Sequence, residues 1–125
     1  MAQVFTVYNC GTGFNRDRTD ELIGYLGTIT AGMQAKPNSV TPQDAWMICD
    51  GPGSAPKGNN PDTRTPGSGL FRQLRGNISG HGWEHNVRDA MAIIKFIHAG
   101  SPISVINMAG WSRGAVTCHM LSNAI

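Results

Sequence analysis

The sequence has few charged residues and no cluster of one sign. Charged residues make up 14% of the 125-residue chain, and the net charge is +2. The ten Lys and Arg residues are scattered from Arg16 to Arg113, whereas nucleic-acid binding needs a concentrated basic surface. Nucleic acid is therefore excluded as an expected partner. Such sparse charge also predicts that another segment or another chain covers part of the surface.

Paired cysteines are also lacking. The three cysteines, Cys10, Cys49 and Cys118, are too few and too widely spaced for a disulfide framework or a zinc site. Cys49 and Cys118 lie in apolar runs, so both are predicted to be buried free thiols. This usage is typical of a reducing compartment.

No pattern in the sequence indicates a metal or a cofactor, and none is expected. His81 and His85 have the spacing of two ligands on one helix, but no Glu follows in the order of a helical zinc motif. The segment from Gly53 to Gly58 is not a nucleotide-binding loop, because Lys57 precedes Gly58 and no Gly-Lys-Ser/Thr follows.

Long apolar runs and a basic leader are missing as well. The longest apolar stretch, 103–111, is interrupted by Ser104 and Asn107 and is too short to span a bilayer. The first ten residues contain no Lys or Arg, so we do not expect a cleavable signal peptide. We predict a cytoplasmic protein, or one exported without such a signal, whose membrane contact is peripheral.

The chain alternates strand-like and helix-like segments. Strands are expected at 4–8, 45–49 and 103–109, and helices at 17–26, 83–99 and 114–125, with one helical turn near 70–74. This order predicts the α/β class, as a three-layer sandwich with a mostly parallel sheet. The continuous apolar run 103–109 predicts a strand buried on both faces.

One stretch, 51–82, breaks this alternation, because it contains eight of the sixteen glycines and four of the seven prolines. Loops of this length are usually functional or mobile. Three strands are too few for a finished parallel sheet. We therefore expect residues 1–125 to be a single N-terminal portion of a truncated domain, inactive alone and completed by a missing C-terminal segment or a partner chain.

The strongest motif is Gly110-Trp111-Ser112-Arg113-Gly114, which lies between a predicted strand and a predicted helix. It has the form of a nucleophile elbow, in which a sharp turn exposes a serine and the two glycines let the strand and helix approach closely. Ser112 is predicted to be a catalytic nucleophile. The backbone amide of Arg113 would then help to form an oxyanion hole.

The segment 110–115, Gly-Trp-Ser-Arg-Gly-Ala, resembles the elbow of α/β-hydrolases related to the type VI secretion phospholipase effectors. The glycine-containing segments 10–15, 51–54 and 80–87 resemble other parts of that family in the same order, with Cys10 in place of the family's usual Asp. The resemblance implies an α/β-hydrolase fold and hydrolysis of carboxylic esters, in a lipase, phospholipase or other esterase that degrades lipid as an effector. It also implies oxyanion-hole amides at Gly11 or Thr12.

A base and an acid for Ser112 are not evident. In this fold both follow the serine, yet the segment 113–125 contains only His119, two helical turns away along a rigid helix, and no carboxylate. Upstream residues offer weaker candidates for the base and the acid. They are His81, His85, His98, Asp50 and Asp89.

Two other functions stay open. A hydrolase-like binding module would retain the elbow geometry without turnover. A cysteine phosphatase would use Cys10 as a thiolate nucleophile and Arg16 to hold phosphate, because the two have the C-x5-R spacing after a strand.

Overall fold

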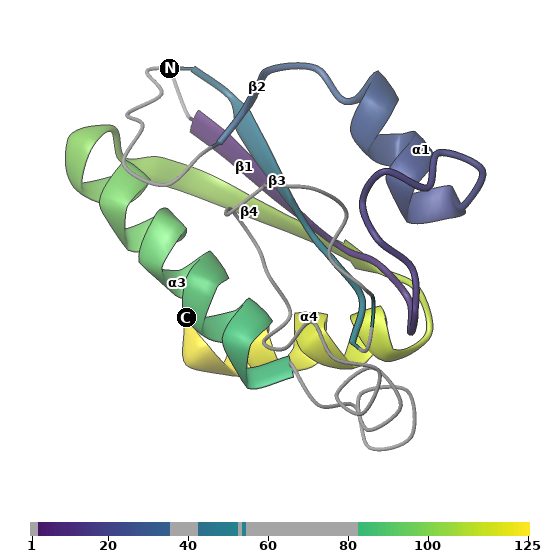
Figure 1. Cartoon of the computed structure of the whole chain (residues 1–125). Coiled ribbons are helices and arrows are strands. Elements are labelled where there is room, and N and C mark those ends of the chain that lie inside the picture. Colours follow the sequence, from purple (N-terminus) through teal and green to yellow (C-terminus); the bar gives the residue numbers. More distant parts are fainter. Residues whose placement is uncertain (1–2, 36–42, 53, 55–82) are drawn as a thin grey trace.

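The computed structural model of the chain describes residues 3–35, 43–52, 54 and 83–125 (Figure 1). The described elements are β1 (Gln3–Asn9), α1 (Leu22–Ile29), β2 (Met33–Gln34), β3 (Ala45–Cys49), α3 (Trp83–Gly100), β4 (Ile103–Gly110) and α4 (Arg113–Ala124). The four strands form one sheet in the order β2-β3-β1-β4, and every described pair of neighbours is parallel. The predicted α/β class with a mostly parallel sheet is confirmed.

The sheet lies between two layers of helices (Figure 1). On one face, α3 and α4 bury Phe5 and Met47 of the central strands, and Ile97 and Leu121 of the helices are fully buried there. On the other face, α1 packs over a smaller cluster that includes Ile23 and Ile48. Burying each such side chain contributes about 1.5–3 kcal/mol, so the central strands β1 and β3 are the most firmly held part of the described fold.

The prediction that strand 103–109 is buried on both faces is wrong. Among the described residues β4 pairs with β1 alone and lies at the edge of the sheet. Ile106 and Met108 pack into the core beneath the helices, whereas Val105, which points to the α1 face, is 46% exposed. An apolar run has the same pattern in an edge strand as in a central one, so the sequence could not distinguish them.

The first helix begins later than predicted, at Leu22 instead of residue 17. The Glu21 carboxylate accepts a hydrogen bond from the Gly24 amide at 3.2 Å and caps the helix. The preceding residues form turns in which Arg18 is paired with Asp20. The two-residue strand β2 was not predicted, because so short an element has no periodicity.

The other expected elements agree with the structure to within one or two residues at their ends. Most of the glycine- and proline-rich segment 51–82, the expected turn at 70–74 and His81 lie outside the described residues. In the described parts of the chain, no helix combines the length and the hydropathy needed to cross a bilayer.

Candidate active site

Ser112 occupies the tight turn between β4 and α4. Its backbone has φ 54° and ψ −124°, and it is the one non-glycine residue with positive φ in the described part of the chain. A side chain held in such a conformation costs about 1–3 kcal/mol, which the surrounding structure must offset. Strain of this kind clusters at active sites and ligand-binding sites.

Gly110 and Gly114 lie in direct contact on either side of Ser112. A Cβ atom at Gly110 would overlap the backbone of Gly114, and a Cβ atom at Gly114 would overlap the carbonyl oxygen of Asn9. Two hydrogen bonds close the turn: the Gly114 amide donates to Trp111 O at 2.8 Å, and the Ala115 amide donates to Ser112 O at 3.0 Å. The backbone therefore forms a sharp turn that only glycine permits at both positions.

Ser112 is an exposed residue, and its hydroxyl does not cap the helix that follows it. A serine at this position usually accepts a hydrogen bond from the first turn of its helix, but Ser112 makes no such bond. No side chain in the described ranges forms a hydrogen bond with its Oγ. The hydroxyl is thus presented to solvent at the N-terminus of α4, where the helix dipole favours negative charge.

The loop after β1 lies against the elbow. A Cβ atom at Gly11 would be 3.0 Å from Cδ1 of Trp111, the residue preceding Ser112. Within the described ranges, no acceptor is found for the amides of Gly11, which is buried, or of Thr12. Buried amides without a partner are rare, so the Gly11 amide is the donor of this loop for which a ligand beside the elbow would be an acceptor.

Three neighbouring amides of this loop donate hydrogen bonds to backbone carbonyl oxygens. Cys10 donates to Cys49 O at 3.1 Å, Gly13 donates to Pro52 O at 3.0 Å, and Phe14 donates to Gly11 O at 3.0 Å. These bonds attach the loop to the end of β3. The loop is therefore held by amides on either side of Gly11 and Thr12.

The structure does not pair any described histidine with Ser112. His98 accepts a hydrogen bond from the Ile103 amide at 3.1 Å, at the far end of the eight-residue strand β4, about 25 Å from the elbow. His85 contacts Arg88 on the surface of α3. His119 lies on the exposed side of α4, beyond the first turn of the helix.

The two candidate acids are engaged with arginines. Asp50 accepts hydrogen bonds from the Arg16 guanidinium at 3.1 and 3.2 Å, and both side chains are about nine-tenths buried. Asp89 lies 4.0 Å from the Nε of Arg88. Neither described carboxylate is placed to orient a histidine toward Ser112.

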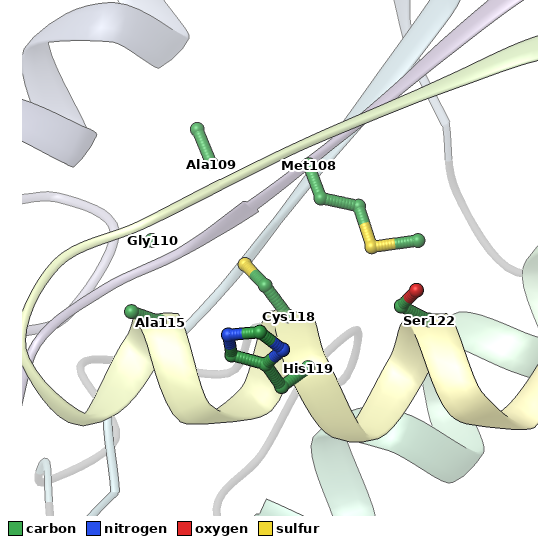
Figure 2. Close-up of a pocket in the computed structure, with 7 residues that line it drawn as sticks. All are labelled: Met108, Ala109, Gly110, Ala115, Cys118, His119 and Ser122. Carbon is green, nitrogen blue, oxygen red and sulfur yellow. The ribbon is translucent and has the colours of Figure 1, made fainter.

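An open pocket of about 530 Å³ lies between β4 and α4, next to the elbow (Figure 2). Its lining residues come from the end of the strand and the exposed side of the helix. They are Met108, Ala109, Gly110, Ala115, Cys118, His119 and Ser122. The pocket opens to solvent at the edge of the sheet that β4 forms.

The geometry around Cys10 weighs against the phosphatase interpretation. Cys10 is 1% exposed, and burial, with smaller effects from Glu21 and Asp50, raises the pKa of its thiol well above the usual range. A phosphatase needs the thiolate and an arginine directed at phosphate. Here the thiol is protonated at neutral pH and the Arg16 guanidinium is bound by Asp50.

All three cysteines are free. Cys49 is fully buried as predicted, and burial raises the pKa of its thiol. The prediction that Cys118 is buried is wrong: it is only partly buried, because it lines the pocket beside β4.

Asn9, which is not among the site residues predicted from the sequence, joins β1 to the elbow. It is 1% exposed, its carbonyl oxygen accepts from the Trp111 amide at 3.3 Å, and its Nδ2 donates to Cys118 Sγ at 3.4 Å. The one feature of the sequence that could have indicated this role is a polar residue at the end of an apolar strand. Asn9 therefore helps to fix the backbone that presents Ser112.

In the parts of the chain that the structure describes, no group of three His, Cys, Asp or Glu residues could hold a metal ion. Comparisons of the chain with known protein families, with curated proteins and with solved structures give no match.

Proposed function

We propose that the protein is a serine hydrolase of the α/β-hydrolase type, related to the type VI secretion phospholipase effectors, that cleaves carboxylic esters of lipids. The observation that carries this proposal is the exposed Ser112 with φ 54°, held between a strand and a helix. Neither capping nor packing explains why a serine should occupy this strained position, whereas a nucleophile elbow places its serine in this way.

In the proposed reaction Ser112 Oγ attacks the ester carbonyl while a base accepts its proton. The alcohol leaves, and water then hydrolyses the acyl-enzyme. The amide of Arg113, at the start of α4, and the amide of Gly11 or Thr12 stabilise the negative charge on the carbonyl oxygen. Each donor of this kind contributes about 3–4 kcal/mol to catalysis. We propose that the base and the acid lie outside the described residues.

The exposed edge of β4 supports a related proposal about the fold. An apolar edge strand without Lys, Pro or a central bulge is a liability in an isolated sheet. We propose that a further segment of the protein, or a partner chain, covers β4 and supplies the missing catalytic groups.

A binding module is the second candidate. It is favoured by one observation, the absence of a contact between Ser112 and any histidine in the described ranges. Such a module would bind an ester or lipid through the same amides without releasing an alcohol. Turnover separates the two candidates.

The test is ester hydrolysis by the protein translated from its complete reading frame. Ser112→Ala is expected to lower turnover of a short-chain aryl ester by about 10⁴-fold or more, because the nucleophile is lost. Ser104→Ala, which changes an exposed serine at the other end of β4, should retain wild-type turnover. Equal activity of the Ser112→Ala variant and the wild type would refute the proposal, and ligand binding without any turnover would favour the binding module.

A further inference from the structure

The Arg16–Asp50 ion pair is unusual among the described charges because it is buried. Arg16 Nε and Nη2 donate to the two Asp50 oxygens at 3.2 and 3.1 Å, and the side chains are 9% and 10% exposed. The Arg16 backbone amide also donates to Asp50 Oδ1, at 2.8 Å. A buried pair of this kind seldom adds much net stability, because desolvation offsets the attraction, but removing one partner is costly.

The pair joins the loop after β1 to the end of β3. Arg16 lies within that loop, which spans residues 10–21, and Asp50 is the first residue after β3. The Asp50 carbonyl oxygen in turn accepts from Asn86 Nδ2 at 2.8 Å, and Asn86 is 2% exposed on α3. The β1 loop is therefore bound through Asp50 to both the sheet and a helix.

The same region is packed to backbone contact. A Cβ atom at Gly51 would overlap the carbonyl oxygen of Gly11, and the Gly51 amide donates to Phe14 O at 2.8 Å. Gly11 lies against Trp111 on its other side. The loop is thus held between the end of β3 and the elbow, and a shift at Asp50 is transmitted to Gly11 without intervening flexible side chains.

We propose that Arg16 and Asp50 are a positioning pair that sets the amides of Gly11 and Thr12 at the distance from Ser112 required to bind the substrate's carbonyl oxygen. This inference rests on the proposed esterase function. Neither side chain is catalytic in it: the arginine and the carboxylate act only through the loop. An arginine and a carboxylate suit this role, because their two parallel hydrogen bonds fix orientation as well as distance.

The activity test uses the protein from its complete reading frame and the variants Asp50→Asn and Arg16→Lys. Both are expected to lower kcat for an aryl ester about 10- to 100-fold, with KM changed less than about threefold. Displaced amides would stabilise the oxyanion of the transition state less, while binding of the substrate would change little. The chain offers a matched control in Asp20→Asn, which breaks the exposed Arg18–Asp20 fork on the same loop. This control should retain wild-type kcat.

Amide hydrogen exchange gives a second readout that needs no catalysis. In folded Asp50→Asn, the amides of Gly13 and Phe14 should exchange at least about tenfold faster than in the wild type, while those of α4 should not. If Asp50→Asn does not fold, Arg16→Lys, which keeps the charge but not the fork, supplies both measurements.

Wild-type kcat in a folded variant, or unchanged exchange in the loop, would overturn the positioning role. Failure of the esterase proposal would give a different result, namely full activity in Ser112→Ala. The exchange measurement would still show whether the ion pair holds the loop.

Discussion

Gly114→Ala is expected to lower the free energy of unfolding by about 3 kcal/mol and to abolish ester hydrolysis. The new Cβ would overlap Asn9 O and lie 2.7 Å from Cys10 O. Both are backbone atoms of the end of β1, so no side chain can rotate away to make room. Either α4 moves away from β1 or the elbow opens, and Ser112 is displaced in both cases.

Gly27→Ala is the control for this change. Gly27 lies within α1, and a Cβ there would be 3.5 Å from Ile48 Cδ1 and 3.5 Å from Trp46 Cζ3, which is ordinary van der Waals contact. Because alanine favours helix more than glycine does, this variant should be more stable by about 0.5–1 kcal/mol. Urea unfolding of both variants measures the difference. Equal stability of Gly114→Ala and the wild type would show that the elbow is not packed as described.

Ser112→Gly is expected to increase stability while it removes activity. Glycine adopts positive φ without a side-chain penalty, so relief of the strain at φ 54° should raise the free energy of unfolding by about 1 kcal/mol. Turnover should fall by about 10⁴-fold or more, as for Ser112→Ala. This opposition between stability and activity is typical of a strained catalytic residue.

Ser104→Gly provides the comparison for this effect. Ser104 lies on the same strand with negative φ, so glycine there should destabilise the protein by about 0.5–1 kcal/mol. The midpoint of urea unfolding, at unchanged slope, measures both variants. Destabilisation of Ser112→Gly as large as that of Ser104→Gly would contradict the strained conformation.

The sharp turn at Ser112 could be predicted because its signals are local. Gly110, Ser112 and Gly114 lie within five residues, and the strand and helix that flank them have clear apolar periods. The start of the first helix is harder to predict, because it depends on the hydrogen bond that the Gly24 amide donates to the Glu21 carboxylate. The apolar period of a helix does not show where a capping residue ends it, so the period alone placed the start too early.

The position of β4 and the role of Arg16 could not be predicted. The apolar pattern of β4 is the same at an edge as in the centre, and only the order of strands decides its burial. Arg16 and Asp50 are separated by 34 residues and meet because β1 and β3 are neighbours. From the sequence alone, Arg16 is a candidate to bind phosphate and Asp50 is a candidate catalytic acid. In the structure the two side chains bind each other.

The role of Ser112 as an activated nucleophile is tested most directly by treating the protein from its complete reading frame with a fluorophosphonate probe. The adduct is then located by mass spectrometry of the digested chain. We predict one adduct, on the peptide that contains Ser112, and no adduct in Ser112→Ala. An adduct that persists in that variant, or a wild-type protein modified only at another residue, would contradict the account.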